Sequence, residues 1–263
     1  MVSDFIFNGR SLSSFGYVLI NTNTEDTQDV SEMELEYIKG ARNDRSYSAG
    51  YKYDANLTAT YTIIKNFCEF PDDQDMTDEE VSEMTRWLCR KQYKWFRFVD
   101  EDEDNNDEVW YKAQWTVKKK FIGDSVVGLD ITVHTNAPYG FSKEIVHEYN
   151  TQSFTINVDS DEEGYIYPDI TIELLEGGDL ELTNAYEDRT TGLKKCVAGE
   201  TITLLGYEVQ QIESTATHDF ITEFNYKFPR LCCEYMNAVN EFEVNLNSKI
   251  TMKYREIRKV GLK

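Results

Sequence analysis

The first twenty residues predict a tight hairpin, which commits the start of the chain to a β-rich fold. Residues 5–7 form an apolar run of strand-forming side chains, and Asn8-Gly9 follows it directly. Asn and Gly tolerate the positive φ angles of a two-residue hairpin turn. Gly16 then lets the chain enter a second apolar strand at residues 17–20. Because both faces of that strand are apolar, we expect it to be covered on both sides.

The composition is that of a globular protein with a preference for β-structure. Hydrophobic residues make up 40% of the 263, and 17 Tyr and 14 Phe supply large side chains for a core. The length corresponds to one large domain or two ordinary ones. No stretch reaches the ~18 consecutive apolar residues of a membrane helix, and the start lacks the apolar segment of a signal peptide. We therefore expect no membrane insertion, and synthesis and folding in a cytoplasm.

The cysteines, at positions 68, 89, 196, 232 and 233, are odd in number and lack C-x-x-C spacing. Disulfide frameworks use paired cysteines, and zinc sites that are recognisable from sequence use closely spaced ones. We interpret these cysteines as reduced, mostly buried thiols. The sequence predicts neither a disulfide framework nor a metal site.

The formal net charge of −21 argues against nucleic-acid binding, which needs a basic footprint. The charge is unevenly spread, because residues 249–263 carry six basic groups and one acidic group. We expect Lys253, Arg255, Arg258 and Lys259 in this segment to meet acidic surface, either on this chain's N-terminal domain or on a neighbouring subunit. Elsewhere an acidic excess ordinarily serves solubility.

The first half of the sequence predicts one helix among several strands. Thr77 and Glu80 have the spacing of a capping box, and an apolar stripe follows them, so we expect a helix over about 77–91. Strands are predicted at 51–67, 95–99, 109–117 and 121–135. The second and third of these strands should pair as a hairpin, and the helix should cover one face of the sheet.

The segment between the two hairpin strands, residues 100–108, is strongly acidic. Its aspartates are Asp100, Asp102, Asp104 and Asp107. A calcium-binding loop is the alternative interpretation, but Asn105 stands where such a loop requires Gly, and Tyr111 stands where it requires Glu. We expect a polar hairpin tip.

The sequence Asn-Ala-Pro-Tyr-Gly at residues 136–140 marks a domain boundary, which gives domains of 1–140 and 141–263. Beyond it no amphipathic helix pattern is found. Short strands are predicted at 153–158, 166–174, 179–183, 200–205 and 209–213. Short strands separated by polar turns are typical of a β-sandwich. The predicted fold class is therefore mainly β.

The sequence contains no recognisable catalytic motif. Its histidines are His134, His147 and His218. His147-Glu148 begins like the H-E-x-x-H zinc motif, but Thr151 stands where the second His is needed. No Walker loop, G-x-G-x-x-G or G-x-S-x-G sequence is present. We therefore predict no enzyme, no catalytic residue and no cofactor.

Three segments, in order along the chain, carry a family resemblance. The first is aromatic-x-aromatic-Asn-Gly followed by a Ser-rich turn and Phe15-Gly16. The second is a helix, then a hairpin, then the junction Pro138-Tyr139. The third is the sequence Phe-Pro-Arg-Leu at residues 228–231, an Asn-containing stretch, and a strand that ends in Tyr254-Arg255. Together they resemble siphophage distal tail proteins, although Cys232-Cys233 departs from that family's pattern.

The resemblance implies a structural virion protein at the tip of a phage tail, made in the cytoplasm of the bacterial host. An N-terminal β-sandwich-like domain with one α-helix and a β-hairpin would form a hub ring, commonly a hexamer. This ring would join the tail tube protein to the tail-associated lysin or fibre protein. A C-terminal galectin-like β-sandwich would carry receptor-binding or baseplate proteins. Double-stranded DNA would pass through the ring without specific binding.

Candidate residues for these roles come from the first half and the basic tail. We expect residues 1–140 to carry oligomerisation, with Phe5, Phe7, Phe15 and Tyr17 as interface candidates. The acidic loops at 72–75 and 100–108 are candidates for lining the channel, where repulsion would keep DNA from binding. The alternative function is a carbohydrate-binding module that recognises the host cell surface through the C-terminal sandwich, with Tyr165 and Tyr167 as possible stacking residues. A tail-associated hydrolase is a weaker third hypothesis.

Overall fold

The computed structural model describes residues 3–20, 30, 33–39, 45–53, 55–99, 108–234 and 238–262. The chain divides into two compact units, residues 1–141 with 259–263, and residues 142–258. The predicted second domain included the closing residues, but 259–263 belong to the first unit. Leu262 is buried in the core of that unit, and the hydroxyl of Tyr111 donates to the carbonyl of Gly261. Among the described helices, none has the length and apolar character needed to cross a membrane.

The first unit is built on a seven-stranded antiparallel sheet with the order β2-β1-β7-β8-β9-β6-β3. The amide of Leu19 on β3 donates to the carbonyl of Ser3, just before β1, at 2.9 Å. The sheet is therefore curled, so that strands near its two ends approach each other. The strands of this unit are β1 (Asp4–Phe7), β2 (Arg10–Ser11), β3 (Tyr17–Ile20), β4 (Met33–Lys39), β5 (Ser46–Tyr53), β6 (Thr58–Lys65), β7 (Lys94–Val99), β8 (Tyr111–Ile122), β9 (Ser125–Thr135) and β10 (Gly140–Phe141), with the short 3-10 helix η1 (Ser13–Phe15) and the helix α1 (Asp78–Leu88).

The predicted Asn-Gly hairpin is confirmed. Phe7 pairs with Arg10 across the turn, and Asn8 and Gly9 have φ angles of 50° and 78°. A two-residue turn between twisted strands requires positive φ at both of its residues, as is found here. The expected cover on both faces of residues 17–20 is wrong, because Ile20 is 40% exposed. A short apolar strand at the end of a sheet can leave one side open.

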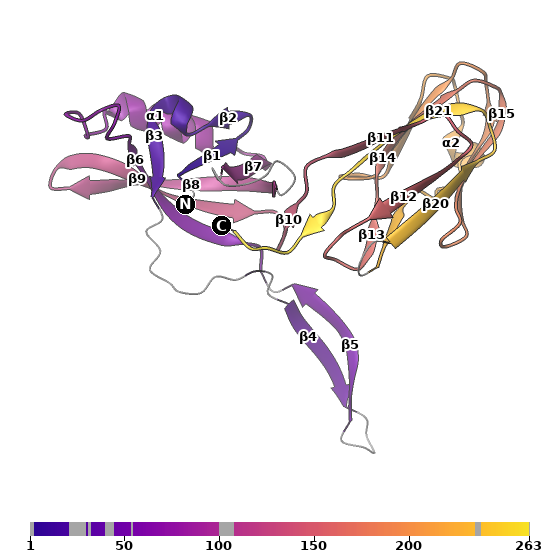
Figure 1. Cartoon of the computed structure of the whole chain (residues 1–263), viewed down its shortest axis with the longest axis horizontal. Coiled ribbons are helices and arrows are strands. Elements are labelled where there is room, and N and C mark those ends of the chain that lie inside the picture. The colour runs from indigo at the N-terminus through magenta and orange to yellow at the C-terminus, as the bar shows by residue number, and fades with distance from the viewer. Residues whose placement is uncertain are drawn as a thin grey trace. The chain divides into compact units, whose positions relative to one another are not determined.

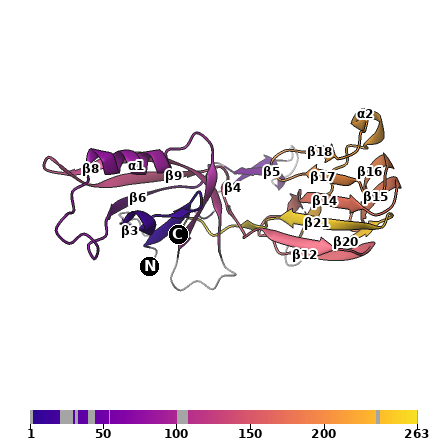
Figure 2. The ribbon, with the colours of Figure 1, turned by 90° about the horizontal axis from the view of Figure 1, so that it is seen from above.

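Helix α1 begins at the predicted capping box and covers one face of the sheet (Figure 1, Figure 2). The Thr77 amide donates to the Glu80 carboxylate at 2.7 Å, and the Glu80 amide donates to the Thr77 hydroxyl at 3.3 Å. Phe5 packs between Trp87 of α1 and Trp115 of β8, with ring centroids 5.5 and 5.0 Å apart. The helix ends at Leu88, three residues before the predicted end. An aromatic core therefore joins helix to sheet.

A buried lysine ties the start of α1 to β6. Lys65, the last residue of β6, is 1% exposed. Its Nζ lies 3.1 Å from Asp73 and 3.0 Å from Glu80. Glu80 therefore serves both the capping box and the buried cation, which fixes the loop at 72–75 and the first turn of the helix together.

Strands β4 and β5 pair with each other and, among the described residues, with no other strand, so they form a separate two-stranded hairpin, which we call the arm (Figure 1). The predicted single strand at 51–67 is wrong, because β5 ends at Tyr53 and β6 begins at Thr58. The alternation of apolar residues continues through the interruption, so pattern alone does not reveal that the two halves join different sheets.

The second unit is a sandwich of a five-stranded sheet, β11-β21-β14-β17-β18, and a four-stranded sheet, β12-β20-β15-β16. Inward-facing aliphatic and aromatic side chains of both sheets form one core, separate from that of the first unit. The elements are β11 (Ile145–Tyr149), β12 (Ser153–Val158), β13 (Gly164–Ile166), β14 (Asp169–Leu174), β15 (Gly178–Asn184), β16 (Arg189–Cys196), β17 (Thr201–Leu205), β18 (Gln211–Ser214), α2 (Phe220–Glu223), β19 (Leu231–Cys233), β20 (Ala238–Val244), β21 (Ser248–Tyr254) and β22 (Ile257–Arg258). The mainly β fold class, with a C-terminal sandwich, is confirmed.

Candidate functional site: the arm and a buried Cys-Glu-His cluster

The arm exposes apolar side chains that a soluble hairpin normally covers. Leu35, Tyr37 and Ile38 on β4 are 46, 59 and 63% exposed. Tyr47 and Tyr51 on β5 are 54 and 51% exposed, and Leu35 lies directly opposite Tyr51 in the register. A two-stranded hairpin alone is only marginally stable in water. Exposed apolar residues on such an element indicate a surface that binds protein.

The end of the arm is attached to the body of the first unit by aromatic contacts. The ring of Tyr53, the last residue of β5, lies edge-on to Tyr139 with centroids 5.8 Å apart. The ammonium of Lys259, from the closing segment, lies 5.6 Å from the centre of the Tyr53 ring. These contacts connect the base of the arm to two segments more than eighty residues away in the sequence.

Three of the four predicted interface aromatics are core residues. Phe5 and Phe7 are 0% exposed and Tyr17 is 5% exposed, so their side chains have almost no surface to offer a neighbouring subunit. Phe15 is half-buried, with its ring 4.7 Å from that of Trp87 and the Arg10 guanidinium 4.1 Å from its centre. The sequence showed that these strands are apolar, but not that α1 and the curled sheet cover them from within the same chain.

The acidic loop residues divide between described and undescribed segments. Asp100, Asp102, Asp104 and Asp107 lie outside the described residues. Glu108, which follows them, is paired with Arg97 at 3.2 Å. In the loop at 72–75, Asp73 pairs with Lys65 and Asp75 accepts a hydrogen bond from the Ser125 hydroxyl at 2.8 Å. Part of this loop's charge therefore serves the fold of the first unit.

The basic residues of the closing segment have different surroundings. Lys253 lies on β21 between Val146 of β11 and Asp169 of β14 in the register. The guanidinium of Arg255 donates to the carbonyl of Ser142 at 2.8 Å, and burial lowers its pKa. Arg258 forms an ion pair with Glu256 at 2.7 Å. Contact with a neighbouring subunit's acidic surface stays a prediction for these residues.

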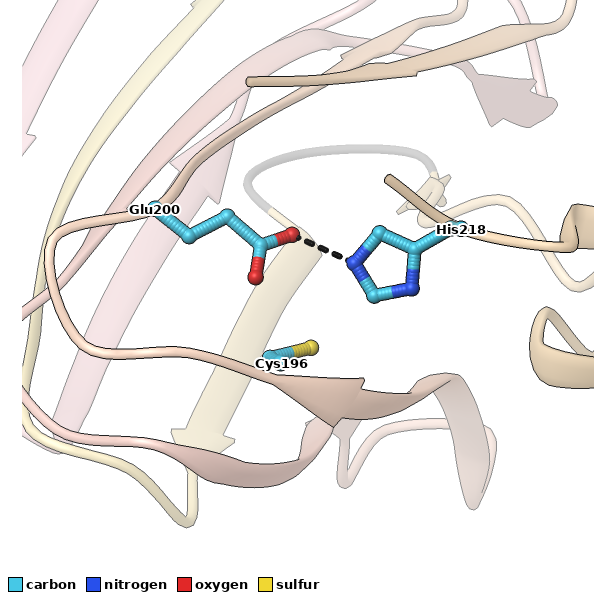
Figure 3. A group of neighbouring side chains, drawn as sticks. All are labelled: Cys196, Glu200 and His218. Atoms are coloured by element: carbon cyan, nitrogen blue, oxygen red, sulfur yellow. Dashed lines mark hydrogen bonds and ion pairs between the residues drawn. The ribbon is translucent and has the colours of Figure 1, made fainter. Parts of the chain in front are cut away.

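The second unit contains a buried cluster that the sequence analysis did not identify. Cys196 ends β16, Glu200 lies in the turn before β17, and His218 lies between β18 and α2. One ligand-type atom from each, the thiol sulfur, a carboxylate oxygen and a ring nitrogen, all lie within 4.8 Å of one another. Figure 3 shows the three side chains directed toward a common point. The side chains of Glu200 and His218 are 0 and 1% exposed.

The histidine of the cluster lies between two carboxylates. Its Nε2 is 2.8 Å from Glu200 Oε1, and its Nδ1 is 2.8 Å from Glu223 Oε2. Glu223 in turn accepts from Lys195 at 2.6 Å. The Ser214 hydroxyl donates to the same Glu200 oxygen at 2.6 Å, and the amide of Val197 donates to the other one at 2.8 Å.

These surroundings shift the pKa values in opposite directions. Burial alone would lower the pKa of His218, but its hydrogen bonds to Glu223 and Glu200 outweigh burial and raise it. The hydrogen bonds from Lys195 and His218 lower the pKa of Glu223 to about 2. Burial raises the pKa of the Cys196 thiol to about 11. The raised pKa of His218 favours its protonated form between the two carboxylates, and the raised pKa of the Cys196 thiol favours its neutral form.

No sequence signal was strong enough to find this cluster. Cys196 and Glu200 have a spacing that occurs frequently by chance, and His218 follows eighteen residues later. The prediction treated Cys196 as a buried thiol, which is correct for its burial at 5% exposure. Only the sandwich brings the ends of β16 and β18 together at one edge.

Comparisons with known proteins agree on the kind of protein to which the chain is similar. Residues 1–137 match a family model described as a phage tail protein N-terminal domain, and residues 139–254 match a model described as a phage tail C-terminal domain. The fold is similar to the crystal structure of the Dit (gp 19.1) protein of phage SPP1, with a TM-score of 0.64 and 11% identity, over 97% of this chain and 99% of that chain. That protein is described as a paradigm of the hub adsorption apparatus in phages that infect Gram-positive bacteria. No curated protein sequence matches the chain. The predicted resemblance is confirmed for the phage-tail family and for the fold.

Proposed function

The chain belongs to the family of phage tail proteins that these two domain models define, and on this premise we propose that it is the distal tail hub of a siphophage-type particle. The observation that carries the proposal is the agreement of both units, along 97% of the chain, with the fold of a hub protein. As a tail protein it is a component of the virion, made in the cytoplasm of the infected bacterium. Its role is structural, and no catalytic step is part of it.

In this proposal the first unit forms the ring, commonly a hexamer, and the arm supplies the contact. Leu35, Tyr37 and Ile38 offer an exposed apolar surface on an element that projects as a hairpin of its own. Because these side chains are about half exposed, covering them fully is worth roughly half of the 1.5–3 kcal/mol of complete burial, or about 1 kcal/mol each. In a ring, each copy would pack its arm against one neighbour and be contacted by the arm of the other neighbour. The same contact would therefore form once for every copy.

The ring would join the tail tube protein to the tail-associated lysin or fibre protein, while the sandwich of the second unit carries receptor-binding or baseplate proteins. Double-stranded DNA would pass through the ring without being bound. Several copies of a chain with net charge −21 make a strongly acidic assembly. Carboxylates facing the channel would repel DNA over about a Debye length, ~8 Å at physiological salt. The loops at 72–75 and 100–108 are the candidates for that lining.

A carbohydrate-binding role for the second unit is the second candidate, and one observation favours it. Tyr165 is 52% exposed, and the Arg230 guanidinium lies 3.5 Å from the centre of its ring. Arg230 is fixed by Glu187 through nitrogen–oxygen distances of 2.9 and 2.5 Å. A ring held in place in this way can stack on the apolar face of a sugar. Glycan-array binding by the full chain that is lost in Tyr165→Ala would support this candidate.

The hub proposal is tested by locating the chain in its particle. Antibodies against the second unit should label purified tails at the end that contacts the host, and cryo-electron microscopy should show a ring of this fold between the tube and the terminal fibre or lysin. Labelling along the tube, or at the end that joins the capsid, would overturn the proposal. Glycan binding with no tip location would favour the carbohydrate-binding alternative.

A further inference from the structure

We propose that Cys196, Glu200 and His218 form a zinc-binding site at one edge of the sandwich. The donor atoms are the Cys196 sulfur, a Glu200 carboxylate oxygen and a His218 ring nitrogen, all within 4.8 Å of one another. We assign the ring nitrogen as Nε2, because it lies 2.8 Å from Glu200, whereas Nδ1 faces Glu223. This proposal concerns the second unit alone and does not depend on the hub function. It revises the prediction that the chain has no metal site.

The donor set fits zinc better than calcium or magnesium. Calcium and magnesium prefer oxygen ligands only, whereas thiolate and imidazole suit zinc. Zinc sites with three protein ligands leave the fourth tetrahedral position to water. The three residues come from the end of β16, the turn before β17 and the segment before α2. Binding would therefore join three neighbouring segments of the chain.

The groups behind the ligands are those that support zinc sites. A histidine that binds metal through one ring nitrogen usually donates its other N–H to a carboxylate. His218 Nδ1 already lies 2.8 Å from Glu223, which Lys195 holds in place. Glu200 accepts hydrogen bonds from Ser214 and from the amide of Val197. Each charged ligand is therefore oriented before any ion arrives.

The exchange of protons for the ion balances in charge. A neutral Cys196 thiol carries one proton, and a His218 that donates from Nε2 to Glu200, 2.8 Å away, carries another. Binding of Zn²⁺ forms a Zn–S bond and a Zn–N bond, and these two protons leave to solvent. The total charge of the buried cluster is the same before and after, so the surrounding fold does not have to accommodate a new buried charge.

The test is a cobalt titration of the purified full chain, because Co²⁺ occupies zinc sites and reports its ligands by absorption. We expect one ion per chain, with a thiolate-to-cobalt charge-transfer band and the visible bands of tetrahedral coordination. Zinc should displace the cobalt and raise the melting temperature of the second unit. Cys196→Ser should abolish the charge-transfer band, and His218→Gln should abolish stoichiometric binding. Glu223→Gln should weaken binding by roughly 10–100-fold, as expected for a group that orients a ligand.

Two controls separate this site from other thiols. The double variant Cys68→Ser/Cys89→Ser removes exposed thiols of the first unit, and Cys233→Ser removes a buried thiol of the second. Both of these variants should keep the thiolate-to-cobalt charge-transfer band. A wild-type chain without the band, or a band that persists in Cys196→Ser, would overturn the proposal. If Cys196→Ser does not fold, the wild-type spectrum and the effect of zinc on its melting temperature still decide.

Discussion

Each unit of the chain buries a cation between two carboxylates, but the two cations differ in how easily they lose a proton. In the first unit Lys65 lies between Asp73 and Glu80, and in the second His218 lies between Glu200 and Glu223. Their side chains are 2 and 1% exposed. Hydrogen bonds to the carboxylates outweigh burial and raise the pKa of both. Lysine then stays charged at every physiological pH, whereas histidine titrates close to that range.

The difference in pKa between lysine and histidine indicates that the two buried ion pairs serve different purposes, although both place a cation between two carboxylates. A lysine between two carboxylates is a permanent link, here between β6, a loop and the capping box of α1. A histidine in the same position has a proton that a metal ion can replace.

This contrast can be tested by its effect on the stability of each unit, and the four tryptophans make the test specific. Trp87, Trp95, Trp110 and Trp115 all lie in the first unit, so tryptophan fluorescence follows the unfolding of that unit alone.

The largest effect is expected for Lys65→Ala. Removing Lys65 takes away a buried side chain and both of its ion pairs, whereas the carboxylates left behind are 71 and 33% exposed and can be hydrated. The loss is therefore that of a large-to-small substitution in a core, about 2–5 kcal/mol. The loss should appear in denaturant unfolding followed by tryptophan fluorescence. Lys120→Ala is the matched control, because Lys120 pairs with Asp130 at 3.1 Å on the surface of the same unit. It should cost less than about 1 kcal/mol. Equal losses in the two variants would mean that burial of Lys65 does not matter.

A smaller loss, confined to the second unit, is expected for His218→Gln. The amide keeps a donor for one carboxylate but removes the positive charge, which leaves a charged group without its hydrogen bond at a cost of about 1–3 kcal/mol. Hydrogen exchange at the amides of β17 and β18 should report it, while tryptophan fluorescence should not change. His147→Gln in the same unit is the control. A shift of the tryptophan transition in His218→Gln would show that the two units do not unfold independently.

With rising pH, the second unit should begin to lose stability at a lower pH than the first unit, because its buried cation is a histidine and that of the first unit is a lysine. The pKa of His218 is raised above 6.5, so its contribution is complete below pH 6.5 and is lost as pH rises through the raised value. The pKa of Glu223 is lowered from 4.5 to about 2, so its contribution is complete above pH 4.5 and is lost as pH falls toward 2. Stability measured with a chelator present should therefore be highest between about pH 4.5 and 6.5. The loss above that window should disappear in His218→Gln, and its persistence there would assign it to another group.

The sequence predicted those features that depend on a few consecutive residues. The Asn8-Gly9 turn and the capping box of Thr77 and Glu80 are local, because their geometry follows from the residue types themselves. The interface role of Phe5 and Phe7 failed because an apolar strand does not show whether its own chain or another covers it. β16 was missed because its apolar positions are sparse and interrupted by Gly192. The Cys-Glu-His cluster could not be predicted, since it exists only where strand ends meet.

The smallest effect on stability, and the largest on assembly, is expected in the arm. Leu35 and Ile38 are 46 and 63% exposed, so Leu35→Ser/Ile38→Ser should change the tryptophan transition by no more than about 0.5 kcal/mol. The same double variant should convert rings to monomers in sedimentation velocity, because the apolar surface that a neighbouring copy would bury is gone. Assembly unaffected by both substitutions would remove the arm from the interface.

The matched control is Val239→Ser, on β20 of the second unit. Val239 is 46% exposed, the same as Leu35, and also lies on a strand. If exposed apolar surface in general promoted association, this variant would weaken assembly as much as the change at Leu35 alone. If the arm is the specific contact, Val239→Ser should assemble like the wild type. A wild-type chain that stays monomeric at the highest concentrations would contradict ring formation by this chain alone. The exposed arm would then have to bind a different protein.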